Sequence, residues 1–193
     1  MPQAFSALRS RVASFDKKVD RAFDGLRGQA AVDRVFYAAS ELGDYSLLWA
    51  MLGCLRGLRS ERDWKAALRM GGGLAAESFL VNAVIKSFFQ RTRPPSEVHR
   101  PLNVRRPRTS SFPSGHATSA FVAAILLSEG DRVWPLYYVL AVIVASSRVY
   151  TKMHHASDVV AGIAVGGALG VAGRRLLPLP PAGDSGEPGG EEG

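Results

Sequence analysis

Five apolar stretches follow one another along most of this chain and limit what it can fold into. They cover residues 35–58, 66–89, 113–129, 132–148 and 157–176. The last two each contain 15 consecutive residues without a charge, 133–147 and 159–173. Such a run covers about 22 Å of a roughly 30 Å hydrocarbon core, so a spanning helix must extend into its polar flanks. A soluble core of 193 residues needs fewer apolar helices, and we therefore expect an all-α, multi-pass bundle of about five transmembrane helices.

The charges narrow the class of protein further. The chain carries 24 Lys and Arg against 17 Asp and Glu, a net charge of +7, while its mean hydropathy is +0.03 because the charges cluster between the apolar stretches. Such basicity is typical of proteins that meet nucleic acid, a membrane surface or a phosphorylated substrate. Cys54 is the only cysteine, which excludes a disulfide scaffold within the chain.

Residues 1–34 form a separate N-terminal segment. Apolar residues recur there at steps of three and four with basic residues between them, which predicts an amphipathic helix over residues 1–27. The segment lacks the uninterrupted apolar core of a cleaved signal peptide. Two placements are open: the helix packs on its own domain, or it lies in the headgroup layer with its basic residues toward anionic lipid. The apolar members are Phe5, Leu8, Val12, Phe15, Val19, Phe23 and Leu26.

Two further segments interrupt or follow the apolar stretches. Residues 90–112 contain six arginines and four prolines, and the prolines prevent a continuous helix. Residues 177–193 contain no Lys or Arg, four acidic residues and much Pro and Gly, so we expect a disordered acidic tail. The predicted organisation is an amphipathic segment over 1–34, a membrane domain over 35–176 and this tail over 177–193.

Two cations mark the end of the second apolar stretch. Lys86 and Arg93 are seven residues apart, so a helix that continued to Arg93 would carry both on one face. Pro94 then ends that helix. Either cation by itself is more often a snorkelling anchor at the membrane edge than part of a binding site.

A short polar sequence, Ser111-Phe112-Pro113-Ser114-Gly115-His116, comes immediately before the third apolar stretch. Pro113 suits a first helical turn, and Gly115 lets a ligand approach the backbone closely. Free N–H groups and the helix dipole then form an anion site beside the hydroxyl of Ser114 and the imidazole of His116. The plain alternative is a helix start with an exposed histidine.

The third motif begins with Arg148 at the end of the fourth apolar stretch, continues with His154 in the following loop, and ends with Asp158 at the start of the fifth stretch. His154 and Asp158 are four residues apart, so the carboxylate can hold one imidazole nitrogen and leave the other free as a nucleophile. Arg148 adds a permanent positive charge whose fork suits phosphate oxygens. His155 is the rival nucleophile, but its i,i+3 relation to Asp158 turns it toward a neighbouring face, and we favour His154.

In a bundle of five spanning helices these three motifs would meet at one end. They resemble the type 2 phosphatidic acid phosphatase superfamily, which also includes bacterial class A acid phosphatases, glucose-6-phosphatase and vanadium haloperoxidases. All three parts of its signature match in order and spacing, and the resemblance covers about residues 35–175. Many membrane members have six spanning helices, and here the surface helix of residues 1–27 would replace the first. The signature reads Lys86-(six residues)-Arg93-Pro94, Pro113-Ser114-Gly115-His116 and Ser147-Arg148-(five residues)-His154-(three residues)-Asp158.

The resemblance implies a metal-independent phosphatase that needs no cofactor. His154 would attack phosphorus and form a phosphohistidine, while Asp158 fixes its tautomer and stabilises the imidazolium. His116 would protonate the leaving alkoxide and then activate water. In keeping with this, no carboxylate cluster suited to Mg²⁺ lies near the three motifs. The equatorial phosphate oxygens would be held by Lys86, Arg93, Ser114, Gly115 and Arg148.

The implied substrate is a phosphate carried on a lipid, and the implied enzyme belongs to the bacterial membrane branch and binds no nucleic acid. Phosphatidic acid, phosphatidylglycerol phosphate, polyprenyl diphosphate and polyprenyl-phosphate sugar phosphate are all open. The small chain, rich in Ala, Gly and Arg, also resembles the decaprenyl-phosphoryl phosphoribose phosphatases of actinobacteria. Two other functions stay open: a vanadate-dependent haloperoxidase, and a catalytically silent membrane protein that binds phospholipid.

The distribution of basic residues predicts the orientation in the cell membrane. Fifteen Lys and Arg would lie on the face that holds the three motifs, and eight on the opposite face. Leaving out Arg93 and Arg148, which the resemblance assigns to catalysis, 13 remain against eight. The positive-inside rule therefore places the site on the cytoplasmic side.

Overall fold

The computed structural model describes residues 2–95 and 109–181, and the regular elements in these ranges are helices. The all-α class expected from the sequence is therefore confirmed. Residues 96–108 of the arginine-rich loop and 182–193 of the expected disordered tail lie outside the described residues. In chain order the elements are α1 (Pro2–Asp24), α2 (Ala30–Leu42), the 3₁₀ turn η1 (Asp44–Ser46), α3 (Leu47–Gly57), α4 (Glu61–Phe79), the π-helix η2 (Leu80–Ile85), α5 (Lys86–Phe88), α6 (Gly115–Ser128), α7 (Trp134–Tyr150) and α8 (Ala156–Leu176).

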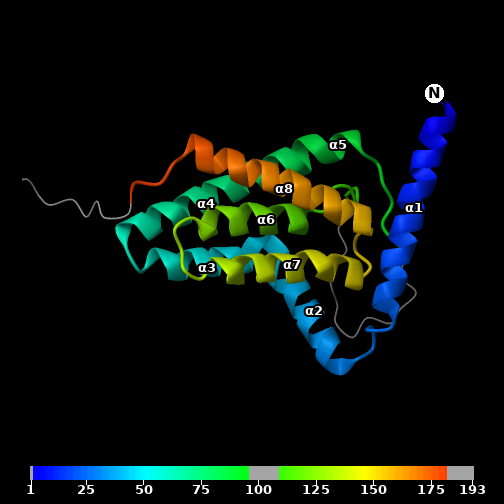
Figure 1. Cartoon of the computed structure of the whole chain (residues 1–193), viewed down its shortest axis with the longest axis horizontal. Coiled ribbons are helices and arrows are strands. Elements are labelled where there is room, and N and C mark those ends of the chain that lie inside the picture. Colours follow the sequence, from blue (N-terminus) through cyan, green and yellow to red (C-terminus); the bar gives the residue numbers. More distant parts are fainter. Residues whose placement is uncertain (1, 96–108, 182–193) are drawn as a thin grey trace, which may run out of the picture.

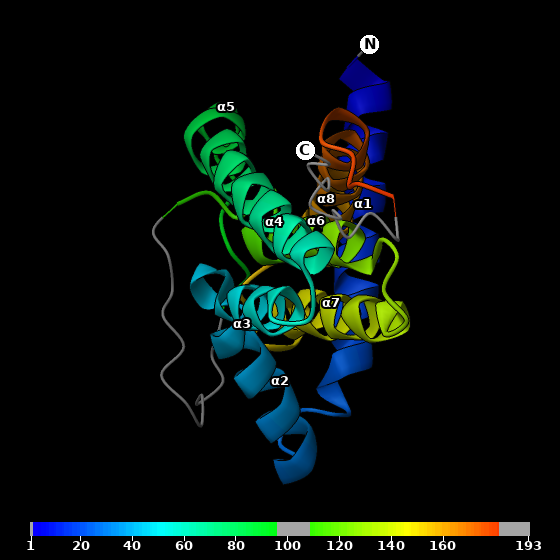
Figure 2. The same cartoon turned by 90° about the vertical axis from the view of Figure 1, so that its left-hand side faces the viewer.

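The bundle is formed by α3, α4, α6, α7 and α8, which run along the long axis of the molecule, while α1 crosses one end of it (Figure 1). α6 is the central helix: nine of its 14 residues are buried, and it packs against α4, α7 and α8. Seen along the long axis, these neighbours surround α6 (Figure 2). The end crossed by α1 is also the end at which α6 and α8 begin (Figure 1).

α8 approaches α6 closely because it presents glycine to it. Gly166 is buried, and a Cβ atom there would lie 2.4 Å from the carbonyl oxygen of Thr118 on α6. That distance is far inside an ordinary van der Waals contact, so only glycine fits without moving one of the helices. Close backbone approach through small residues is typical of helices that pack within membranes. It also brings together the second and third sequence motifs, which lie at the starts of these two helices.

The first apolar stretch, residues 35–58, folds as two helices instead of one continuous helix. α2 ends at Leu42 and α3 begins at Leu47, with a different direction (Figure 1). Between them Tyr45 and Ser46 have φ values of 54° and 58°, in the left-handed region that a right-handed helix cannot contain. The turn-forming pair Gly43 and Asp44 is the sequence signal for this break.

The second apolar stretch ends its helix before Arg93. α4 continues through the π-helix η2 into α5, which ends at Phe88, and Phe89 is already extended with φ −122° and ψ 126°. The idea that Lys86 and Arg93 share one face of a continuous helix is therefore wrong, because Arg93 lies in the following loop. A π-helix turn is uncommon and is frequently found at functional sites.

The number of membrane spans does not follow from helix length. Within the described residues, α8 is the one helix that is long and apolar enough to cross a membrane, and α6 is apolar but shorter. The expected count of about five spans thus stays a prediction.

The end of the bundle away from α1 is closed by paired charges. Asp131 accepts hydrogen bonds from Arg59 at 2.6 Å and from the Tyr137 hydroxyl at 2.8 Å. Burial raises the pKa of Asp131, but the hydrogen bonds from Arg59 and Tyr137 outweigh it and lower the pKa to about 2. Arg56 is buried and pairs with Asp63 at 2.7 Å. Arg56 and Arg59 at this end are therefore held in ion pairs within the protein.

Candidate active site

A cavity of about 790 Å³ lies where α6 begins, and it brings the three sequence motifs together. Six of the eight predicted site residues line this cavity. The remaining two, Ser114 and Asp158, are fully buried. The cavity continues between α3 and α4, where apolar residues line it, among them Ala50, Met70 and Leu74. It therefore joins a cationic pocket to an apolar groove. The six predicted residues that line it are Lys86, Arg93, Gly115, His116, Arg148 and His154.

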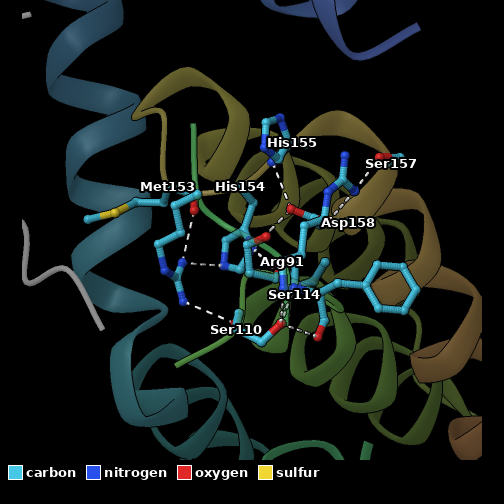
Figure 3. Close-up of polar contacts among 12 residues, drawn as sticks. Arg91, Ser110, Ser114, Met153, His154, His155, Ser157 and Asp158 are labelled. Carbon is cyan, nitrogen blue, oxygen red and sulfur yellow. Dashed lines mark hydrogen bonds and ion pairs between the residues drawn. The ribbon is translucent and has the colours of Figure 1, made fainter. Parts of the chain in front are cut away.

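His154 is held with one ring nitrogen bonded to the backbone and the other near a cation of the cavity. Its Nδ1 lies 2.7 Å from the carbonyl oxygen of Ser111. A carbonyl oxygen only accepts hydrogen bonds, so Nδ1 carries the proton and Nε2 keeps its lone pair. Nε2 lies 3.2 Å from Nη1 of Arg93, which also donates to the carbonyl of Met153 at 2.8 Å (Figure 3). This tautomer is the one that a nucleophilic Nε2 requires.

The surroundings of His154 keep its ring neutral. Only 3% of the residue is exposed, and burial lowers the pKa of His154 to about 3, helped by the nearby cations of Arg148 and Arg93 and opposed by Asp158. Nε2 is therefore unprotonated throughout the neutral pH range, and Nη1 of Arg93 is its nearby donor. A neutral imidazole beside cations is chemically suited to attack an anionic phosphorus centre.

Asp158 lies behind His154, but it does not set the tautomer directly. Its Oδ2 is 3.8 Å from Nδ1 of His154, beyond hydrogen-bonding distance, and accepts instead from the backbone N–H of His155 at 2.9 Å. Its Oδ1 accepts from Nη1 of Arg91 at 2.6 Å (Figure 3). The expectation that the carboxylate fixes the tautomer of His154 is therefore wrong. The Ser111 carbonyl fixes it, and Asp158 supplies negative charge beside the ring.

His116 points into the cavity from the first turn of α6 and meets a residue that the motifs do not contain. Its Nε2 lies 2.9 Å from Oδ1 of Asp44, in the break between α2 and α3. Gly43 makes this approach possible, because a Cβ atom there would lie 2.7 Å from Cδ2 of His116. The break in the first apolar stretch therefore places a carboxylate against the second histidine.

Each cation of the cavity has its own support. Nζ of Lys86 donates to the side-chain oxygen of Asn82 at 2.8 Å. Asn82 lies about one helical turn earlier, in η2. A Cβ atom on Gly115 would lie 3.7 Å from this Nζ, so the first motif reaches the start of α6. Arg148 is 1% exposed and donates through Nη1 to the hydroxyl of Ser40 on α2.

Ser114 has a structural position that differs from its predicted one. It is the N-cap of α6, and its hydroxyl accepts from the backbone N–H of Ala117 at 3.5 Å. Its own N–H donates to the carbonyl of Asp158 at 3.0 Å and joins the starts of α6 and α8. Gly115, the next residue, is the one that borders the cavity.

Four residues that contact the predicted site residues were not predicted from the sequence. Ser111 adjoins the second motif, and Arg91 is one of six arginines in a loop, so neither stands out. Ser40 and Asp44 lie in the first apolar stretch, outside all three motifs. Gly43 and Asp44 signal a turn there, but no sequence pattern assigns Ser40 or Asp44 to the site. Only the fold brings them to Arg148 and His116.

The comparison with known families agrees with this geometry. Residues 66–179 match the PAP2 superfamily. The chain belongs to the PAP2 superfamily. The decaprenylphosphoryl-5-phosphoribose phosphatase of Mycobacterium tuberculosis is 34% identical to it over 134 residues, which are 68% of this chain and 72% of that protein. The enzyme of the same name from Mycolicibacterium smegmatis is 35% identical over 140 residues, 71% of this chain and 74% of its own.

Two solved PAP2-type structures share the fold. A transmembrane PAP2-type phosphatidylglycerolphosphate phosphatase from Bacillus subtilis superposes with a TM-score of 0.66 and 26% identity, covering 86% of both chains. LpxE from Aquifex aeolicus gives a TM-score of 0.63 and 25% identity, covering 82% of this chain and 93% of its own. The family expected from the three motifs is therefore confirmed. The chain is a membrane lipid phosphatase of the PAP2 family, which works without a metal.

Proposed function

We propose that this phosphatase hydrolyses a lipid phosphate monoester or diphosphate through a phosphohistidine on Nε2 of His154. The observation that carries the proposal is the 2.7 Å contact between Nδ1 of His154 and the Ser111 carbonyl, which leaves Nε2 as the unprotonated nitrogen. Nε2 adjoins Arg93, on the cavity that also holds Lys86 and Arg148. A phosphate group in this cavity would meet the nucleophile and the cations together.

The reaction has two steps. Nε2 of His154 forms a bond to phosphorus, the ester P–O bond breaks, and protonated His116 gives its proton to the leaving oxygen. Water then attacks the phosphohistidine, the now neutral His116 takes a proton from that water, and the N–P bond breaks to return neutral His154. Asp44, 2.9 Å from Nε2 of His116, favours the protonated ring that the first step requires, while burial and the charge of Arg148 oppose it.

The charges around His154 suit this sequence of events. Lys86, Arg93 and Arg148 would bind the equatorial oxygens, whose charge must be stabilised as phosphorus becomes five-coordinate. The N–H of Gly115, at the first turn of α6, would add a donor at a helix N-terminus. Ser114 acts by holding this turn in place, and Asp158 stabilises the positive imidazole ring of the intermediate.

We also propose that the bundle spans the membrane with several helices, as a multi-pass membrane domain over residues 35–176. Large apolar side chains on the outer faces of α4, α7 and α8 are about half exposed, which suits a lipid environment. Trp64 and Trp134, 51% and 54% exposed, lie at the far end of the bundle, where aromatic residues are frequent at a membrane interface. The outward apolar residues include Leu68, Phe79, Val139, Val142 and Val160.

The N-terminal segment over 1–34 would lie along the membrane surface at the end that contains the active site. α1 runs across the bundle axis, so it is parallel to the membrane plane when the bundle is upright (Figure 1). Val19 and Phe23 pack on the domain, while Phe5 and Leu8 are 64% and 58% exposed. The two placements left open by the sequence thus combine: one part of the helix packs inward and another remains for lipid.

The cavity and the relatives support the same class of substrate. The apolar groove between α3 and α4 would accept a lipid chain while the phosphate sits among the cations. The relatives are named for decaprenylphosphoryl-5-phosphoribose and for phosphatidylglycerolphosphate, and a shorter match of 63 residues is named undecaprenyl-diphosphatase. We therefore expect a polyprenyl phosphate, a polyprenyl diphosphate or a glycerophospholipid phosphate as substrate.

The test is phosphate release by the purified full chain from a panel of these lipids, with and without EDTA. His154→Ala should lower kcat by several orders of magnitude because the covalent step is lost, while His155→Ala, the matched control, has a much smaller effect. Turnover should persist in EDTA. Wild-type-like kcat in His154→Ala would refute the phosphohistidine, and loss in EDTA with rescue by Mg²⁺ would show a different mechanism.

We propose that the active site faces the cytoplasm, following the excess of Lys and Arg at its end of the bundle. Single cysteines in a Cys54→Ser background test this with a membrane-impermeant thiol reagent on intact cells. Gln90→Cys, exposed near the site, should be protected, and Arg132→Cys, exposed at the opposite end, should react. Labelling of Gln90→Cys with protection of Arg132→Cys would reverse the orientation.

A further inference from the structure

We propose that Asp16 on α1 is a positioning residue for the Asp158–His154 pair and acts through Arg91. The inference rests on the proposed function of His154. It assigns a role in catalysis to the N-terminal segment, which lies outside the residues matched to the PAP2 superfamily.

A chain of short contacts joins α1 to the site. Oδ2 of Asp16 lies 2.6 Å from Nη2 of Arg91, and Nη1 of Arg91 lies 2.6 Å from Oδ1 of Asp158. One planar guanidinium therefore holds two carboxylates at once (Figure 3 shows the Arg91–Asp158 side). Arg91 also donates to the hydroxyl of Ser157 at 2.8 Å.

Asp16 is anchored a second time, at the start of α8. Its Oδ1 accepts from the backbone N–H of Ser157 at 2.8 Å, and its Oδ2 accepts from the Ser157 hydroxyl at 2.9 Å. Ser157 directly precedes Asp158, so α1 fixes the turn from which the catalytic carboxylate projects. Free N–H groups at a helix start favour a carboxylate in this position.

The burial of Asp16 sets it apart from the rest of its helix. Asp16 is 6% exposed, while the basic residues on either side of it in sequence, Lys17 and Arg11 among them, are exposed. Buried aspartates are rare unless they are paired. The next acidic residue, Asp20, pairs with Arg27 at 2.6 Å and with Lys152 at 3.2 Å, and these ion pairs do not include Arg91, Asp158 or His154.

The electrostatic role of Asp16 is to share the charge of Arg91. In the phosphohistidine the ring of His154 is positive, and Asp158 stabilises it. If a residue without charge replaces Asp16, the guanidinium of Arg91 is balanced by Asp158 alone, and less negative charge acts on the ring. The transition state and the intermediate would lose this electrostatic stabilisation. Ground-state phosphate binding would keep its own, because it depends on the cations on the other side of His154.

The experiment compares Asp16→Asn with Asp20→Asn in the full chain, reconstituted in vesicles and assayed with the lipid phosphate that the wild type hydrolyses fastest. Asparagine keeps an oxygen for the Ser157 N–H, so α1 should stay docked. We expect kcat to fall about ten-fold or more, the effect of one charge-assisted hydrogen bond, with KM changed less than two-fold. Asp20→Asn should retain wild-type kcat. Unchanged kcat in Asp16→Asn, or an equal loss in Asp20→Asn, would overturn the proposal.

A double-mutant cycle separates positioning from a purely structural role. Arg91→Gln should lower kcat because Asp158 loses the guanidinium that holds its carboxylate in place, and adding Asp16→Asn to it should lower kcat no further, because both changes break one network. Fully multiplicative effects would overturn the proposal. Orthovanadate affinity, measured by calorimetry, provides a readout that does not need turnover: Asp16→Asn should weaken binding several-fold and Asp20→Asn should not. Equal vanadate affinity in the two variants would overturn the proposal even if the enzyme hydrolyses none of the lipids in the panel.

Discussion

Replacing Gly166 with alanine should force apart the two helices that carry the active site. The new Cβ would lie 2.4 Å from the carbonyl oxygen of Thr118 and 3.1 Å from its Cα, while ordinary contacts begin near 3.4 Å. α8 and α6 must then separate by about 1 Å, and overpacking of this kind costs about 1–3 kcal/mol. Because His116 and Asp158 lie at the starts of these helices, kcat should fall together with stability.

Gly167 offers a matched control at the next position of α8. A Cβ atom there meets nothing within 4 Å. Alanine gains up to about 1 kcal/mol over glycine in helix propensity at either position, so this gain cancels when the two variants are compared. Thermal unfolding in detergent should therefore give Gly166→Ala a Tm about 2–12 °C below that of Gly167→Ala, at about 2–4 °C per kcal/mol. Equal Tm values would refute the close packing of α6 on α8.

Two further predictions concern the chemistry of the site. With the pKa of His154 lowered to about 3, the ring is about 99% neutral at pH 5, whereas an ordinary pKa of about 6.5 would leave about 3% neutral. NMR titration of ¹⁵N-labelled histidine, assigned with His154→Ala, should show no titration of this ring between pH 5 and 7, and a midpoint near 6.5 would contradict the burial argument. The unfolded chain binds a proton on this histidine below pH 6.5 while the folded chain does not, so this group lowers stability as the pH falls from about 6.5 toward 3. Orthovanadate should inhibit competitively because it mimics five-coordinate phosphorus, and Arg148→Ala should weaken inhibition and turnover together. Vanadate-dependent bromide oxidation without dephosphorylation would instead favour a haloperoxidase.

The sequence predicts the site residues that belong to the three motifs, because their spacing along the chain is characteristic. Lys86, Arg93, Gly115, His116, Arg148 and His154 all line one cavity, as expected from the three motifs. The motifs lie at helix ends, and the ends of antiparallel neighbours meet in a bundle whatever the details of packing. The same logic predicts the all-α class, since each long apolar stretch needs its backbone hydrogen bonds satisfied internally.

The residues that hold these groups are beyond sequence reasoning because long-range packing selects them. The Ser111 carbonyl replaces Asp158 as the partner of Nδ1 in His154, and a backbone oxygen leaves no trace in residue identity. Asp44 reaches His116 only because the first apolar stretch breaks at Tyr45, where a periodicity argument sees one apolar run. Hydropathy detects burial in these segments but not the left-handed residues that redirect them.

His154 lies between cations on one side and a buried carboxylate on the other, and in the proposed mechanism this order would let one site attract phosphate and stabilise a charged intermediate. In front of the ring, the cavity is bordered by three cations that favour an anionic substrate. Behind it, Asp158, Arg91 and Asp16 alternate in sign, so negative charge lies next to the ring and is itself held in place. At the far end of the bundle Arg59 is paired with Asp131 in the protein, and no comparable cationic pocket forms among the residues described there. In the proposed mechanism the free energy of phosphate binding and the stabilisation of the imidazolium would come from different residues, and substitutions behind the ring should therefore change kcat with little effect on KM.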